Sequence, residues 1–143
     1  MEDNKVIKFN VNFRRKPKEK GDSRRGYALF NEGLCFYRQN KDDMALEKFL
    51  ASEKEGYESS DMLAFIAWIY GSKNDYEMSK KYAQKSLDID SKNGFAYSVI
   101  ASCYYHLDDT ENCLKFGLKA FDNEYDVDAT LCRQILRRNK KSR

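Results

Sequence analysis

The sequence contains little proline, glycine and histidine: its 143 residues include one Pro, seven Gly and one His. So few Pro and Gly leave few obligatory breaks in a chain rich in Lys, Glu, Leu and Ala, and this favours α-helices. The sequence also lacks a glycine-rich phosphate loop, zinc-ligand spacing and a nucleophile elbow. We therefore expect a helical protein that is not an enzyme and has no cofactor.

Long apolar runs are missing as well. No stretch of about 18 apolar residues is present, and the N-terminus lacks the charged-then-apolar pattern of a secretory signal. The four cysteines Cys35, Cys103, Cys113 and Cys132 form no CxxC pair and lie in apolar helical runs. That placement is typical of reduced, buried thiols rather than of disulfides or metal ligands. We expect a cytoplasmic chain without membrane contact and without a bound metal.

The net charge of +3 is unevenly distributed. Residues 1–25 carry nine Lys or Arg against four acids, and residues 133–143 carry six against none. Residues 26–132 hold eleven bases and nineteen acids, so two basic ends flank an acidic middle. Such ends either are disordered and keep a protein soluble or contact nucleic acid or a membrane surface, and the absence of interleaved aromatic residues favours the first interpretation.

Three stretches align at a fixed spacing of 34 residues when they start at Gly26, Ser60 and Gly94. Small residues recur at three positions of each stretch: Gly33, Ala67 and Ala101; Ala45, Ser79 and Cys113; Ser52, Ser86 and Ala120. An aromatic residue recurs at a fourth position: Phe36, Tyr70 and Tyr104. Polar, cap-competent residues interrupt each stretch at 40–43, 74–75 and 108–110. Each stretch is therefore predicted to be two helices in close contact.

The pattern of small and aromatic residues at this spacing resembles the tetratricopeptide repeat (TPR) family. The resemblance implies an all-α fold: a right-handed α-α superhelix of three TPR-like helical hairpins with a C-terminal capping helix. The implied organisation is a flexible basic N-terminal segment with a short apolar stretch at 1–25, repeats at 26–59, 60–93 and 94–127, and the capping helix with a basic tail at 128–143.

The resemblance also implies a concave groove lined by the first helix of each repeat. Its predicted lining residues are Tyr27, Phe30, Leu34, Tyr37, Arg38, Phe65, Trp68, Phe95, Val99, Ser102, Tyr105 and His106. An aromatic groove suits an amphipathic helix or an extended segment, each buried apolar anchor contributing about 1.5–3 kcal/mol. One TPR subclass instead grips C-terminal carboxylates with Lys, Asn and Arg. Here its five positions are Phe30, Leu34, Phe65, Phe95 and Val99, so that mode of binding is not expected.

The predicted function is therefore that of a protein-protein interaction scaffold or chaperone-like adaptor, with a protein or peptide partner. One alternative is a nucleic-acid- or ribosome-associated protein that uses its basic ends. A second alternative is a self-associating TPR module of a larger protein, which includes a homodimer. Binding through the basic ends would weaken steeply with added salt, whereas groove binding would not.

Two residue pairs look catalytic but have simpler explanations. Asp108 and Asp109 lie at a predicted turn, where they are expected to cap a helix. Cys103 and His106 are three residues apart, but no orienting group or oxyanion donor accompanies them. We therefore assign no catalytic residue.

The N-terminal segment contains a second pattern. In residues 5–13 the apolar side chains of Val6, Ile7, Phe9, Val11 and Phe13 alternate with polar ones, as in an extended segment. Our hypothesis is that this segment docks on an apolar surface, either the chain's own groove or that of another copy. The alternative is a leader without fixed structure.

Overall fold

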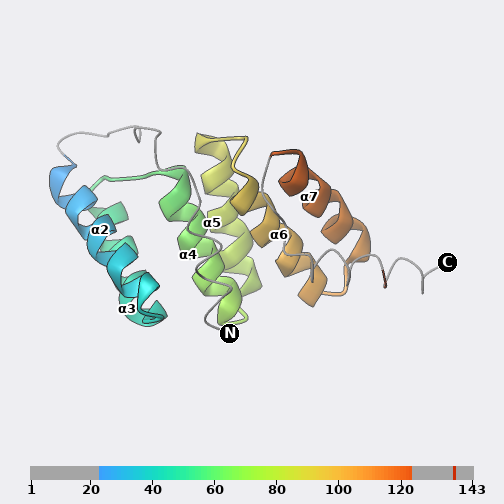
Figure 1. Ribbon diagram of the computed structural model, residues 1–143, viewed down its shortest axis with the longest axis horizontal. Helices are drawn as coiled ribbons and strands as arrows, with labels where there is room; N and C mark the ends of the chain where they lie inside the picture. The colour runs from blue at the N-terminus through green and yellow to red at the C-terminus, as the bar shows by residue number, and fades with distance from the viewer. Residues whose placement is uncertain (1–22, 124–136, 138–143) are drawn as a thin grey trace.

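A computed structural model describes residues 23–123 and residue 137 of the chain. The described residues form six helices, α2 Arg24–Arg38, α3 Asp42–Lys54, α4 Ser60–Ser72, α5 Tyr76–Ile89, α6 Gly94–His106 and α7 Thr110–Asp122. Consecutive helices pair as hairpins, and the three hairpins follow one another along the long axis of the molecule (Figure 1). This is the all-α stack of helical hairpins that the sequence predicts.

The same turn joins the two helices of every hairpin. A residue with positive φ lies in each turn: Asn40 at 60°, Asn74 at 65° and Asp108 at 58°. Asn and Asp adopt this left-handed conformation more readily than other non-glycine residues do. The three residues are spaced by 34 positions, so the sequence period is also a period of backbone conformation.

Side-chain caps begin four of the six helices. The side chains of Ser59, Asp75, Asn93 and Asp109 each accept a hydrogen bond from the main-chain N–H three residues further along. Such a cap contributes about 1 kcal/mol to helix stability. Asp109 is thus a helix cap, as predicted. Helices α2 and α3 begin without a side-chain cap bond, so the first hairpin has less local support than the other two.

The nine small residues of the repeat pattern lie where the paired helices approach each other, and all nine are buried. A Cβ atom added at Gly33 would lie 2.5 Å from Cε1 of Phe49, so the closeness of α2 and α3 requires glycine there. At Ala67 the contact is also polar, because the hydroxyl of Ser79 donates a 2.7 Å hydrogen bond to its carbonyl oxygen. Small side chains therefore set the helix spacing within the hairpins.

The hairpins pack on each other with unequal closeness. Helix α6 packs along both α4 and α5, whereas α3 meets α4 over a shorter stretch and α2 makes few contacts with α4. In Figure 1, α2 and α3 correspondingly stand apart from α4. Aromatic rings connect the first two hairpins, since Tyr37 and Phe49 lie 5.0 and 6.0 Å from Phe65 between ring centroids.

Two predicted segments lie outside the described residues: the N-terminal segment through residue 22 and, apart from helical, exposed Arg137, the capping helix and tail at 128–143. Cys132 falls in the latter. Among the described helices, none is long and apolar enough to cross a membrane. The described residues likewise contain no group of three or more His, Cys, Asp or Glu side chains that could hold a metal ion.

Candidate peptide-binding groove

The contacts of α4 with its hairpin partner show which of its faces points inward. Tyr70 stacks on Tyr82 of α5 at 5.7 Å, and the carbonyl of Ala67 accepts the hydrogen bond from Ser79 of α5. At 100° per residue, Phe65 lies on the opposite side of α4. The same argument places Val99 of α6 opposite α7, because Tyr104 stacks on Phe116 at 5.6 Å. The inner row of helices is thus α2, α4 and α6.

The predicted groove residues fall into three classes of exposure. The buried ones are Phe30, Leu34, Tyr37, Phe65, Phe95 and Val99; the half-buried ones are Trp68, Ser102 and Tyr105; the exposed ones are Tyr27, Arg38 and His106. Along α4 and α6, exposure increases from the first turn to the last. The aromatic set is therefore not one open patch, because only the end of the inner wall near the hairpin turns is accessible.

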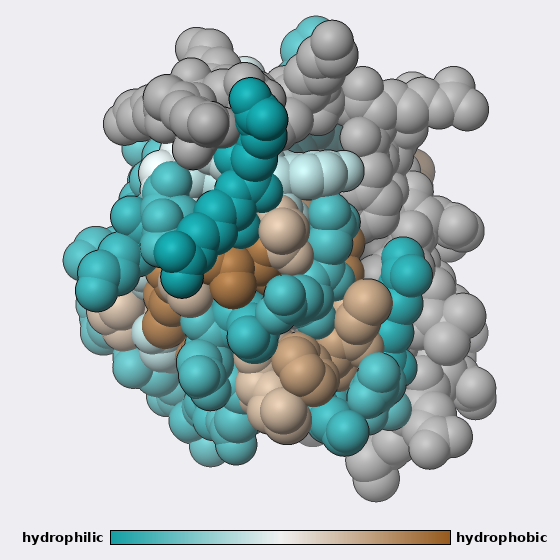
Figure 2. All heavy atoms as spheres, turned by 90° about the vertical axis from the view of Figure 1, so that its left-hand side faces the viewer, coloured by the Kyte–Doolittle hydropathy of each residue, from teal (hydrophilic) through white to brown (hydrophobic). Residues whose placement is uncertain are grey.

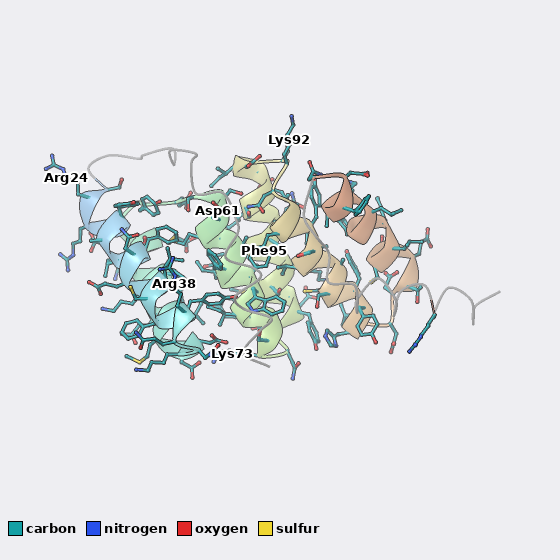
Figure 3. All side chains as sticks on the ribbon, viewed as in Figure 1. Arg24, Arg38, Asp61, Lys73, Lys92 and Phe95 are labelled. Atoms are coloured by element: carbon teal, nitrogen blue, oxygen red, sulfur yellow. The ribbon has the colours of Figure 1, made fainter. Side chains whose placement is uncertain are left out.

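Aromatic contacts bring residues of all three repeats together on this wall. Phe65 lies 5.0 Å from Tyr37 of the first hairpin and 5.7 Å from Phe95 of the third. Trp68 lies 6.3 Å from the same Phe95, which Figure 3 shows among the inner helices. Such ring pairs contribute about 0.5–1.5 kcal/mol each beyond their buried area. The predicted groove aromatics therefore also hold the stack together.

A small cavity opens at the accessible end of the wall, between α4 and α6. Its volume is about 80 Å³, and it is lined by Trp68, Gly71, Ser72, Tyr76, Ser79, Val99, Ser102, Cys103 and His106. Four of these, Trp68, Val99, Ser102 and His106, are predicted groove residues. The structure thus places side chains from the second and third repeats around one hollow of the size of a single amino-acid side chain.

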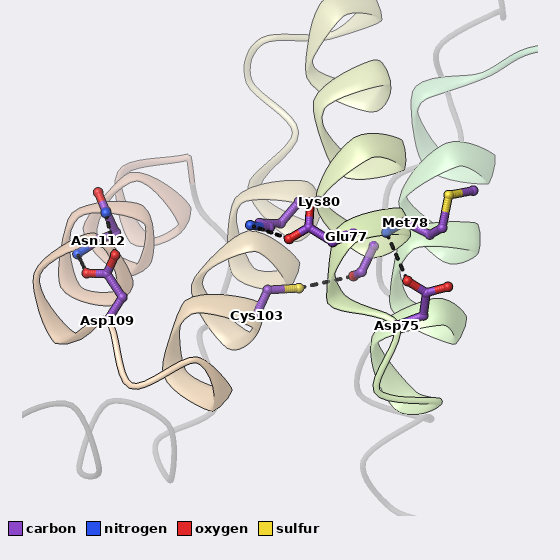
Figure 4. A network of polar contacts seen from close by, with 8 residues as sticks. Asp75, Glu77, Met78, Lys80, Cys103, Asp109 and Asn112 are labelled. Carbon is purple, nitrogen blue, oxygen red and sulfur yellow. Dashed lines mark hydrogen bonds and ion pairs between the residues drawn. The ribbon is translucent and has the colours of Figure 1, made fainter.

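The cavity combines apolar walls with oriented polar groups. The thiol of Cys103 donates a 3.1 Å hydrogen bond to the hydroxyl of Ser79 (Figure 4). Burial raises the pKa of Cys103, so this residue stays a neutral thiol near neutral pH. The thiol is therefore directed at Ser79, and we find no thiolate to pair with His106.

The imidazole of His106 is positioned by two rings. It stacks on Tyr76 at 5.4 Å with an interplanar angle of 11°, and Tyr105 meets it edge-on at 5.4 Å. Because Tyr76 belongs to α5, the second helix of a repeat also contributes to the groove. Tyr76 and Gly71 were not predicted to lie in the groove, because the predicted groove residues came from selected positions of the first helices. Their nearness to the turn between α4 and α5 was the available signal.

Charged residues lie at both ends of the apolar wall, as Figure 3 shows. Half-buried Asp61 is in the first turn of α4, where its carboxylate accepts a 3.3 Å hydrogen bond from the amide of Asn93. At the other end Lys73 pairs with Asp43 of the first hairpin. Arg38 is exposed on the last turn of α2. The groove therefore has an apolar centre between polar ends.

The surface at the free end of the stack is different. Figure 2 looks onto the α2 and α3 end and shows apolar side chains among hydrophilic ones. The large exposed hydrophobic residues of these two helices are Tyr27 and Met44, which are 51% and 45% exposed. Tyr27 contacts Tyr57 at 5.5 Å, so it belongs to the rim of the first hairpin rather than to the cavity.

Comparison with known proteins supports the repeat assignment. The sequence model of the tetratricopeptide repeat matches residues 60–93. No curated protein shows a significant match to the sequence.

Solved structures show the same fold. The first TPR of Spaghetti (RPAP3), bound to the HSP90 peptide SRMEEVD, superposes with a TM-score of 0.71 and 14% identity over 84% of this chain and 94% of that one. The TPR domain of Arabidopsis OM64 superposes with a TM-score of 0.73 and 14% identity over 85% and 98% of the two chains. From the matched repeat and the shared fold, we conclude that residues 60–93 form a tetratricopeptide repeat and that the chain has the fold of TPR domains.

Proposed function

We propose that this protein is a non-catalytic, cytoplasmic adaptor that binds a segment of another polypeptide in its concave groove. We also propose that its repeats span residues 26–59, 60–93 and 94–127. The observation that carries the proposal is the cavity between α4 and α6, lined by Trp68, Val99, Ser102 and His106. Apolar walls provide affinity for a buried anchor side chain, and a few oriented polar groups provide its orientation.

The wall chemistry supports an apolar anchor with a polar end. Trp68 and Val99 provide apolar surface, and the absence of a side chain at Gly71 leaves room between α4 and α5. Ser102 and His106 add a hydroxyl and an imidazole on the more exposed side. A medium-sized partner side chain with one hydrogen-bonding group, such as Met, Gln or His, fits this combination.

The RPAP3 domain is bound to a peptide of HSP90 that ends in acidic residues, but the chemistry of the present groove differs from a carboxylate clamp. The five positions implied for such a clamp carry no positive charge, and four of them, Phe30, Phe65, Phe95 and Val99, are at most 4% exposed. We therefore propose binding through apolar anchors instead.

The test is selection from a random peptide library displayed on phage, followed by affinity measurements on synthetic copies of the enriched peptides. Ser102→Arg places a long charged side chain at the half-buried cavity wall, and we expect it to weaken binding on the order of tenfold or more, the loss of one anchor. Gln84→Arg adds the same charge on the exposed face of outer helix α5 and should leave affinity unchanged.

Either of two results would contradict the proposal. One is a library from which no sequence is enriched by the full chain or by any variant with an opened groove. The other is an enriched peptide whose affinity falls equally with Ser102→Arg and Gln84→Arg, which would indicate binding by general charge. Circular dichroism of both variants separates loss of binding from loss of fold.

A further inference from the structure

The inner faces of α4 and α6 are buried although the described helices cover them only in part, through the contacts of Tyr37 and Phe49 with Phe65. Phe65 is 0% exposed, and Phe95 and Val99 are each 2% exposed. The hairpin partners α5 and α7 lie on the opposite sides of α4 and α6. Helix α6 packs mainly on α4, α5 and α7, and α2 makes few contacts with α4. The described helices thus leave the α6 part of this face, around Val99, without a helix packed across it.

We propose that residues 5–13 of this same chain occupy the groove as an extended segment, so that the protein carries an internal occupant of its peptide site. The inference rests on the proposed function, because it assigns this segment to the groove that binds the outside partner. It commits to an intramolecular occupant rather than to a second copy of the chain.

The chemistry of the segment matches the wall. In an extended conformation, alternate side chains point to opposite sides, so Ile7, Phe9, Val11 and Phe13 share one side. Val6, Lys8, Asn10 and Asn12 share the other side, which is mainly polar and suits contact with water. Four apolar anchors on one side fit the apolar inner surface around Phe65 and Val99. Each anchor that becomes buried favours docking, whereas a helix formed by the same residues would scatter them around its axis.

The connection between segment and groove is long enough. Nine residues, 14–22, separate Phe13 from Ser23, and an extended chain of that length spans about 30 Å. Arg24 at the start of α2 and Asp61 at the start of α4 both lie on the upper side of the stack in Figure 3. Helix α4 has 13 residues and is therefore about 20 Å long. The segment can enter at this end and follow the groove.

Charge favours the same arrangement. Residues 14–22 contain five Lys or Arg and two acids, whereas residues 23–123 contain 13 Lys or Arg against 16 Asp or Glu. Half-buried Asp61 lies at the end of the groove where the basic connection would pass. Opposite charges orient such an encounter even when they add little affinity. A tethered segment also acts at a high effective concentration, in the millimolar range for a short flexible connection.

The functional consequence is competition. An outside peptide must displace the internal segment, so its apparent affinity is reduced by the fraction of molecules in which the groove is open. The segment thereby sets a threshold for partner binding, and only partners with stronger anchors than Ile7, Phe9, Val11 and Phe13 bind well.

The experiment compares two double variants of the full chain that change the charge equally. Phe9→Asp with Phe13→Asp places carboxylates on the proposed contact side, and Asn10→Asp with Asn12→Asp places them on the opposite side. The readout is the fluorescence emission maximum of Trp68, the only tryptophan. We expect a shift to longer wavelength in the first variant only. A synthetic peptide of residues 3–15, added to that variant, should reverse the shift.

Two results with the variants would overturn the inference: no emission shift in the Phe9 and Phe13 variant, or equal shifts in both variants. A wild-type emission maximum that moves to longer wavelength on dilution would overturn it as well, because it would identify a second copy of the chain as the source of the segment. The proposed function fails separately. If the Phe9 and Phe13 variant shows the emission shift but no library peptide binds, the proposed function is refuted, whereas docking of residues 5–13 in the groove is still supported. Equal library-peptide affinity for the wild type and the Phe9 and Phe13 variant would refute the occupant alone.

Discussion

The hydroxyl of Ser86, near the end of α5, donates a 2.6 Å hydrogen bond to the main-chain carbonyl oxygen of Ser60, at the start of α4 in the same hairpin. Ser52 makes the same 2.6 Å bond to Gly26 in the first hairpin. The third hairpin has Ala120 at the equivalent position, which cannot donate. Ser60 in turn donates to the carbonyl of Ser86 and accepts a 2.8 Å bond from the amide of Asn93. The buried polar network is thus largest in the second repeat.

We predict that Ser86→Ala lowers the free energy of unfolding by about 1–3 kcal/mol, because it leaves buried polar groups around Ser60 without a partner. Ser52→Ala should cost less, since its hydroxyl serves a single carbonyl. Urea denaturation followed by circular dichroism measures both values. Equal losses for the two variants would show that the connection to Asn93 adds nothing to stability.

Substitution of Gly33 should be costly. The new Cβ of Gly33→Ala would lie 2.5 Å from the ring of Phe49, so α2 and α3 must move apart, and we expect a loss of about 1–3 kcal/mol. Gly71→Ala is the matched control, because its Cβ would lie 3.1 Å from the hydroxyl oxygen and 3.7 Å from the Cβ of Ser79. There the higher helix propensity of Ala, about 1 kcal/mol, offsets the closer contact. Urea midpoints that fall equally would contradict this assignment.

The Asp109 cap should make the third hairpin sensitive to acid. Hydrogen bonds from the side chain and backbone of Asn112 lower the pKa of Asp109 below its usual value. A lowered pKa means that the folded state binds the proton less readily, so its contribution to stability is present above about pH 4 and is lost as the pH falls through the lowered value. In Asp109→Asn the cap no longer titrates. Its melting temperature should therefore fall less between neutral and acidic pH than that of the wild type, as measured by circular dichroism.

The cysteines should differ in reactivity. Cys35 is exposed, whereas Cys103 and Cys113 are buried, and burial raises the pKa of Cys103. Because the thiolate is the reacting form, iodoacetamide at neutral pH should alkylate Cys35 before Cys103, which should react on the order of tenfold more slowly. Mass spectrometry of proteolytic peptides at successive times gives the two rates, and urea should equalise them. Rapid labelling of Cys103 in the folded protein would mean that the cavity opens frequently.

The repeat architecture could be predicted because it rests on short-range constraints. Residues such as Gly33, Ala67 and Ala101 must be small wherever two helices of a hairpin cross, so the 34-residue period is legible in the sequence. The turns at Asn40, Asn74 and Asp108 follow for a similar reason, since a left-handed backbone favours Asn or Asp. These features require knowledge only of neighbouring helices.

The accessibility of the groove residues could not be predicted in this way. Trp68 and Phe65 are three residues apart and both were placed on one wall, yet Phe65 is fully buried while Trp68 borders a cavity. The difference arises because Tyr37 and Phe49 from the first hairpin pack on Phe65. No local rule specifies how far one hairpin leans on the next.

The sequence by itself therefore determined the helices, their turns and the 34-residue repeat, because each depends on backbone preference and on contacts within one hairpin. The tertiary structure alone decided the looser contact of the first hairpin with the second, the cavity beside Trp68, and the inclusion of Tyr76 from an outer helix in the groove. These features depend on the angle between successive hairpins, which is set by the sum of many side-chain contacts across the stack.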